Sequence, residues 1–119
     1  MRSCIQWILA FVFLSSCYYD NEEYLYGEDA CVDGDATYAG VVSGIIQRNC
    51  LSCHSQSVAS GGIILDNYNS VSLHAKSGRL LGAVTHASGF SPMPKNAARL
   101  SDCNINAIKS WVESGALNN

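Results

Sequence analysis

The chain has 119 residues, enough for one small domain, and a formal net charge of −3 at pH 7. Seven of its ten acidic residues lie between Asp20 and Asp35, whereas six of its seven basic residues follow Ala36. These basic residues are scattered and form no block of the kind that binds nucleic acid, so no nucleic-acid partner is predicted.

The first sixteen residues have the pattern of a secretory signal peptide. A short basic start precedes a nearly all-apolar run from Ile5 to Leu14, which is too short for the about 20 residues of a membrane-spanning helix. The next residues, Leu-Ser-Ser-Cys, resemble a bacterial lipobox, in which cleavage leaves the cysteine as a lipid-modified first residue. We therefore expect residues 1–16 to be a lipoprotein-type signal peptide and Cys17 to carry lipid; an ordinary signal peptide cut nearby is the alternative.

Residues 17–36 have no apolar periodicity, and their acidic residues predict a solvated, lipidated tether that holds a domain off a membrane. The protein is thus predicted to be exported and lipid-anchored, in the bacterial periplasm or on the cell surface. Leftover cysteines of exported proteins usually pair, so we predict a disulfide between Cys31 and Cys103, with two buried free thiols as the alternative. Such a bridge would stabilise the fold by about 4 kcal/mol.

The remaining residues, 37–119, are predicted to form the folded domain. Apolar residues recur there at helical spacing, and no segment has a strand pattern, so the fold class is all-α. The predicted helices span residues 37–49, 68–76, 79–86 and 101–115. Residues that favour helix starts or stops lie at the ends of these segments: Thr37, Gly78, Ser101 and Gly115.

Residues 50–54 read Cys-Leu-Ser-Cys-His, the C-x-x-C-H pattern of covalent haem attachment. Two thiols at this spacing can each add across one vinyl group of a porphyrin, and the adjacent His54 can donate a ring nitrogen to the iron. The alternatives are a zinc site that uses Cys50, Cys53 and two histidines, and a redox-active dithiol. Zinc would normally need a second pair at matching spacing, and the dithiol usually follows a strand. The sequence therefore favours one haem c bound by these two cysteines and His54.

Met93 is the predicted sixth ligand of the iron. It lies between Pro92 and Pro94, which restrict the backbone, so the thioether can be held facing the metal. A methionine sulfur also raises the reduction potential relative to two imidazoles. His74, interpreted as a surface residue, and His86, which could instead bind a propionate, are the alternative ligands. Other candidate donors to the haem propionates are Arg79, Lys95, Arg99 and Trp111.

Between residues 36 and 115 the chain resembles a small class I-type cytochrome c domain, and in particular the lipoprotein-anchored monohaem c-type cytochromes of bacteria. The resemblance is carried by the order of helices, C-x-x-C-H motif and methionine loop, and by the segments Gly-Phe-Ser-Pro-Met-Pro and Leu-Ser-Asp-Cys. It implies three to five helices around one covalently bound haem, with the first and last helices crossing. It also implies that Cys50 and Cys53 are thioether donors, His54 is proximal and Met93 is distal.

The chain departs from the family pattern in its first helix. The family usually places a glycine eight residues, and an aromatic residue four residues, before the first haem cysteine, where this chain has Val42 and Ile46. We therefore expect these two side chains to make a looser contact with Trp111 of the last helix.

The predicted function is that of a single-electron carrier between redox partner proteins. It has no small-molecule substrate and is not an enzyme. The alternative is a haem-based gas sensor or binding module with a labile sixth ligand, which requires that Met93 not bind the iron.

Overall fold

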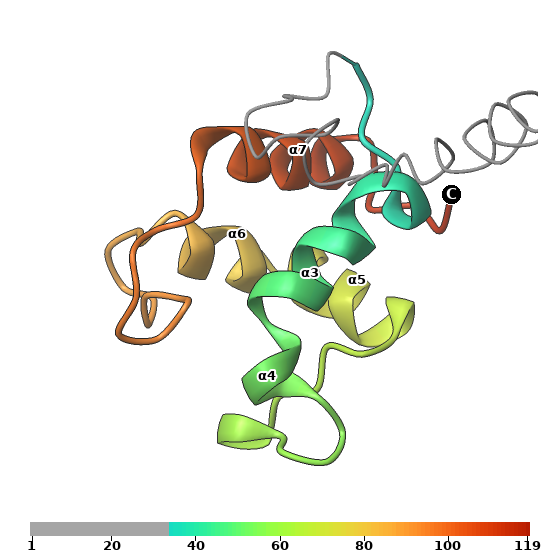
Figure 1. The fold of residues 1–119 in the computed structure, drawn as a ribbon. Coiled ribbons are helices and arrows are strands. Elements are labelled where there is room, and N and C mark those ends of the chain that lie inside the picture. Colours follow the sequence, from blue (N-terminus) through green and yellow to red (C-terminus); the bar gives the residue numbers. More distant parts are fainter. Residues whose placement is uncertain (1–33) are drawn as a thin grey trace, which may run out of the picture.

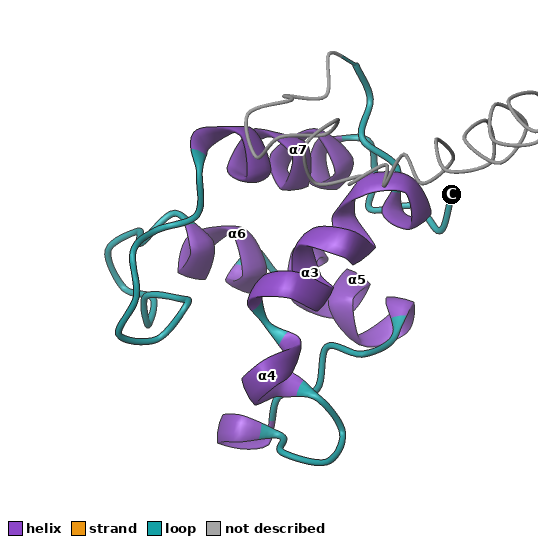
Figure 2. Cartoon of the chain, in the orientation of Figure 1, coloured by secondary structure: helices purple, strands orange, loops and turns teal. Residues whose placement is uncertain are grey.

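The structure is a computed structural model that describes residues 34–119; the predictions for the signal peptide, Cys17 and Cys31 lie outside this range. The described residues form an all-α domain without strands (Figures 1 and 2). Its elements are η2 (Tyr38–Val42), α3 (Ser43–Asn49), α4 (Leu51–His54), η3 (Ser60–Gly62), α5 (Tyr68–Lys76), α6 (Arg79–Val84) and α7 (Asp102–Glu113). None of these helices combines the length and apolar character that a membrane span requires.

The helix ends follow the capping signals of the sequence. The side chains of Thr37 and Ser101 each accept a hydrogen bond from the backbone N–H three residues on, at 3.1 and 3.3 Å. Gly78 separates α5 from α6 with φ of 75°, a left-handed conformation that costs glycine little. The predicted middle helix is confirmed, whereas α6 ends at Val84, before the predicted residue 86.

The predicted first helix begins with a π-helical turn, η2, which continues into α3. Its apolar stripe is buried in the core, with Val42, Ile45 and Ile46 at most 2% exposed. Cys50 is the C-cap residue of α3, and its N–H donates to the carbonyl of Ile46 at 2.9 Å. The prediction that the first motif cysteine lies at the C-terminal end of this helix is confirmed.

The first and last helices meet at Trp111, which is fully buried. The indole Nε1–H donates to the carbonyl of Leu117 at 2.8 Å. The Tyr38 ring lies against the indole, with ring centroids 5.5 Å apart, and Val42 and Ile46 belong to the same core. An aromatic contact with Trp111 is therefore present, but it comes from η2 rather than from position 46.

The C-terminal segment lies against the start of the first helix. The N–H groups of Tyr38 and Ala39 donate to the side-chain and backbone oxygens of Asn119, at 3.0 and 2.9 Å. The Tyr68 hydroxyl donates to the carbonyl of Ala116 at 2.8 Å. The first N–H groups of a helix have no acceptor within the helix. The Thr37 side chain accepts from the Gly40 N–H, and Asn119 supplies acceptors for the N–H groups of Tyr38 and Ala39.

Candidate functional site

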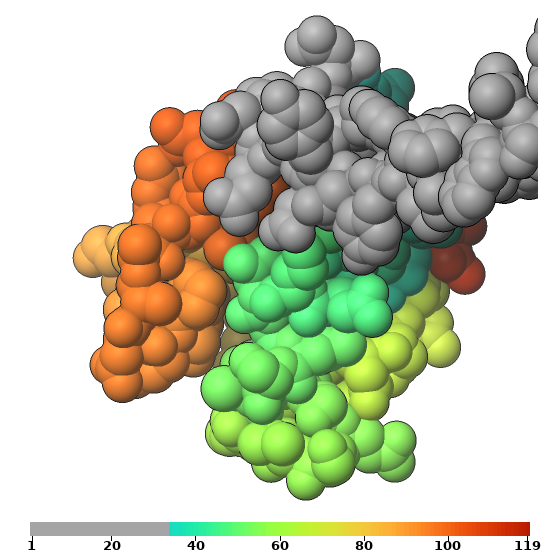
Figure 3. Space-filling view, viewed as in Figure 1, coloured from blue at the N-terminus to red at the C-terminus, as the bar shows by residue number. Residues whose placement is uncertain are grey.

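A cavity of about 850 Å³ lies between the α3–α4 segment, the α5–α6 pair and the loop that follows α6. In the space-filling view it opens between the green α3–α4 segment and the orange loop (Figure 3). Pockets for small molecules and cofactors typically have volumes of about 300–1,000 Å³ and mainly apolar walls. The apolar residues of this wall include Ile63, Leu65, Leu80, Ala83, Val84 and Leu100.

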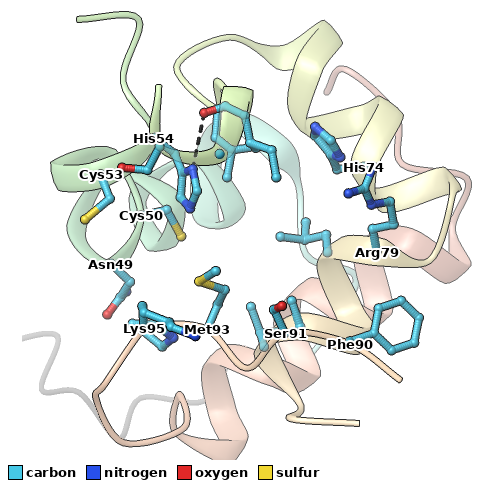
Figure 4. A pocket seen from close by; sticks show the side chains of 18 of the residues that line it. Asn49, Cys50, Cys53, His54, His74, Arg79, Phe90, Ser91, Met93 and Lys95 are labelled. Carbon is cyan, nitrogen blue, oxygen red and sulfur yellow. Dashed lines mark hydrogen bonds between the residues drawn. The ribbon is translucent and has the colours of Figure 1, made fainter. Parts of the chain in front are cut away.

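The α4 turn brings the whole C-x-x-C-H motif to one side of this cavity (Figure 4). The N–H groups of Cys53 and His54 both donate to the carbonyl of Cys50, at 3.1 and 2.9 Å, so one turn holds the three side chains together. Both thiols are free, with Cys50 half-buried and pointing into the cavity and Cys53 exposed.

The His54 ring is buried and held in one tautomer. Its Nδ1 lies 3.2 Å from the carbonyl oxygen of Ile63, and because a carbonyl can only accept, Nδ1 carries the proton and donates. This bond occupies Nδ1 and leaves Nε2 as the ring nitrogen that could bind a metal, the arrangement found in metal-binding histidines. No sequence pattern indicates this role for Ile63, because the acceptor is a backbone atom.

Met93 lies on the other side of the cavity, and its thioether and the His54 ring face each other (Figure 4). The Met93 N–H donates to the carbonyl of Ala83 in α6 at 3.0 Å, which fixes the loop against that helix. The two residues that the sequence predicts as axial ligands thus line one cavity from facing sides. His86 is not among the lining residues; its ring lies against the carbonyl of Met93.

His74 and Arg79 lie across the cavity from the two thiols (Figure 4). His74 is half-buried and lines the cavity, so its interpretation as a surface residue was incomplete. Burial, and then electrostatic interactions with Arg79 and His54, lower the pKa of His74. The Arg79 guanidinium gives this end of the cavity a positive charge, which favours negatively charged groups.

Of the four candidate propionate donors, two line the cavity and two do not. Arg79 and Lys95 line the cavity. Arg99 instead pairs with the Asp102 carboxylate at 2.6 Å, and Trp111 lies in the core.

The two other interpretations of the motif fit this site less well. Burial raises the pKa of the Cys50 thiol to about 11, which disfavours the thiolate that a redox dithiol uses. In residues 34–119, no three His, Cys, Asp or Glu side chains come close enough together to hold a metal ion. The set of two cysteines, one imidazole and one thioether fits a porphyrin better than a tetrahedral metal.

Cys103, in the first turn of α7, is disulfide-bonded. The proposed partner, Cys31, lies outside the described residues, so the Cys31–Cys103 pairing stays a prediction.

No protein-family model, curated protein or solved structure matches the chain. The functional conclusion therefore depends on the motif and on the geometry of the cavity.

Proposed function

We propose that the protein is a monohaem c-type cytochrome that carries single electrons. The observation that supports this most is the set of side chains in one cavity: the Cys50 and Cys53 thiols and the His54 ring on one side, and the Met93 thioether facing them (Figure 4). A c-type haem needs two covalent anchors and an axial nitrogen, and a methionine sulfur is a common second ligand. The all-α domain would then be a cytochrome c-like fold around one haem.

Each residue of the set has a separate role in this proposal. Each thiol would add across one vinyl group, with sulfur bonding to one vinyl carbon and the thiol proton passing to the other, so attachment would need no oxidant or reductant. His54 would bind the iron through Nε2 because Nδ1 is held by the Ile63 carbonyl. Met93 would bind it through its sulfur from the facing loop. The bound haem supplies the redox chemistry, since its iron changes between the ferric and ferrous states.

The positive end of the cavity supports a definite orientation of the group. The two vinyl and the two propionate substituents of a porphyrin occupy opposite edges of the ring. His74 and Arg79 lie across the cavity from Cys50 and Cys53 (Figure 4), so a porphyrin with its vinyl edge at the two cysteines would have its propionates towards His74 and Arg79. We expect these two residues to bind the propionates, and the apolar wall to exclude water from the iron.

The proposal includes a location outside the cytoplasm. Lipid on Cys17 and the acidic tether would hold the domain on a bacterial membrane, in the periplasm or at the cell surface. The partners would be other redox proteins that dock weakly. Exposed Arg79 and Lys95 at the cavity edge would help to steer an acidic partner, partly offset by the propionates.

Expression of the exported chain together with a haem-attachment system tests the proposal. We expect the intact mass to rise by one haem and the purified protein to show the visible absorption of a c-type cytochrome. The matched control is the Cys50→Ser, Cys53→Ser double variant, which should gain no covalent mass. A wild-type chain that gains no haem under conditions in which a known cytochrome does would refute the assignment.

The Met93→Ala variant distinguishes the electron carrier from the gas sensor. We expect the oxidised wild-type protein to show a sulfur-to-iron charge-transfer band at the red end of the visible spectrum, and the variant to lose it. Carbon monoxide should bind slowly to the reduced wild type and fast to the variant, because only the variant has an open sixth site. Fast binding to the wild type, with no such band, would favour the sensor.

A further inference from the structure

The C-terminal end of α6 has an unusual residue at the position where its chain reverses. The N–H of His86 donates to the carbonyl of Ala83 at 3.2 Å, and the N–H of Ala87 donates to the carbonyl of Gly82 at 2.9 Å. These two bonds define a Schellman motif, in which the residue at the His86 position is left-handed and usually glycine. His86 adopts this conformation with φ of 56°, which is unfavourable for a residue with a side chain.

The His86 side chain makes a contact that glycine could not make. Its Nε2 lies 3.0 Å from the backbone carbonyl oxygen of Met93, and because that oxygen can only accept, Nε2–H is the donor. The Met93 N–H donates to the carbonyl of Ala83, which is also the acceptor for the His86 N–H. Both backbone polar groups of Met93 are thus bonded to the end of α6.

These contacts matter because most of the loop is exposed to solvent. Residues 87–92 are exposed, whereas Met93 is half-buried with its thioether in the cavity (Figure 4). Two hydrogen bonds on either side of one α-carbon fix the direction of its Cα–Cβ bond. The ring donor of the left-handed His86 is one of the two groups that set the direction from which the Met93 side chain enters the cavity.

We propose that His86 is a positioning residue that holds the Met93 backbone on α6 and keeps the thioether facing His54. This inference rests on the proposed function, because holding the sulfur matters only if it is a ligand. It predicts that loss of the His86 side chain loosens the sulfur from the iron while the fold stays intact.

The His86→Gly variant tests this. Glycine relieves the unfavourable backbone conformation, so we expect the denaturation midpoint to be equal to or above that of the wild type. The hydrogen bond is lost, so carbon monoxide should bind the reduced protein about two- to tenfold faster, which is the effect of one hydrogen bond on methionine release. Hydrogen exchange at the Met93 amide should accelerate by a similar factor.

Two further variants serve as controls. Asn96 lies in the same loop and is also left-handed, with φ of 57°, so Asn96→Gly makes the same backbone change away from Met93 and should leave both rates unchanged. His86→Gln keeps a side-chain N–H at the same number of bonds from the backbone and should restore most of the protection. Rates for His86→Gly that equal those of the wild type, or an equal acceleration in Asn96→Gly, would overturn the proposal. Hydrogen exchange needs no bound group, so a chain that proves to bind no haem refutes the proposed function while still measuring the contact between His86 and Met93.

Discussion

At the scale of single residues, the two thiols of one motif have different surroundings. Cys53 is exposed, whereas Cys50 is the half-buried C-cap of α3, where burial raises its pKa to about 11. At pH 8 only a small fraction of the Cys50 thiol is therefore ionised. Only the thiolate reacts with alkylating reagents, so the two positions should differ in reactivity before haem is attached.

We predict that iodoacetamide modifies Cys53 well before Cys50 in the haem-free protein at pH 8. The rate at Cys50 should keep rising with pH until about pH 11, as peptide mapping by mass spectrometry would measure. The same shift affects stability: the folded state holds the Cys50 proton more tightly than the unfolded chain, so this contribution is full below the unfolded pKa and is lost as pH rises towards 11. Equal modification of both thiols at pH 8 would contradict the burial of Cys50.

The candidate site residues could be named from the sequence because each is part of a local pattern. Cys50, Cys53 and His54 form one pentapeptide, and Met93 lies between two prolines. Their supporting contacts could not be predicted, because each involves a backbone group whose partner follows no sequence pattern. The Ile63 carbonyl that holds His54 has no sequence signature, since every residue has such an oxygen.

Among the secondary-structure elements, α6 contacts the loop that contains Met93 at one point of close approach, between Gly82 and the Phe90 ring. A β-carbon built at Gly82 would lie 2.6 Å from the Phe90 ring, so only glycine allows the ring to rest on the helix. Phe90 is 41% exposed and lines the cavity, so its ring position depends on this gap. The absence of a side chain at residue 82 thus shapes the cavity edge.

We predict that Gly82→Ala lowers the free energy of unfolding by about 1–3 kcal/mol, because the Phe90 ring must leave its contact. Denaturation in urea would measure the change. Gly44→Ala in α3 is the matched control: its new β-carbon would meet only the flexible end of Arg48, at 3.2 Å, so the usual gain of about 0.5–1 kcal/mol for alanine in a helix should appear. In a Phe90→Ala background Gly82→Ala should become stabilising, and a failure to do so would mean that the ring is not the cause.

The ends of these elements show what sequence patterns can and cannot predict. The middle helix agrees with its prediction because Asn67, whose side chain accepts from the Ser70 N–H, and Gly78 act locally. The end of α6 was placed too late because a histidine, not a glycine, takes the left-handed position there. The π-helical start of the first helix was also missed, since the apolar spacing of residues 38–46 fits an α-helix equally well.

At the scale of the whole molecule, the last residues join the first and last helices. Asn119 accepts hydrogen bonds from Tyr38 and Ala39, and Leu117 accepts one from the buried Trp111 indole. These hydrogen bonds therefore join the first helix, the last helix and the C-terminal segment into one unit. Sequence patterns do not reveal such a unit, because its members are separated by the length of the domain.

We predict that Asn119→Ala lowers the free energy of unfolding by about 1 kcal/mol, the net contribution of one hydrogen bond, because the Tyr38 N–H loses its side-chain acceptor. Chemical denaturation followed by tryptophan fluorescence would measure it. Asn118→Ala, a change at the neighbouring exposed residue, should stay within about 0.5 kcal/mol of the wild type. Equal losses in both variants would mean that the segment acts through something other than this bond.

The hydrogen bonds of Asn119 to η2 also determine at which end of the domain residue 119 lies. The first helix runs from η2 to Cys50, and its twelve residues span roughly 18 Å, so residue 119 lies at the end remote from the motif (Figure 1). A fluorescent label, a purification handle or a linker to an electrode could be added after residue 119 without covering the open edge of the cavity. A protein immobilised in this way would present that edge to whatever approaches it from solution.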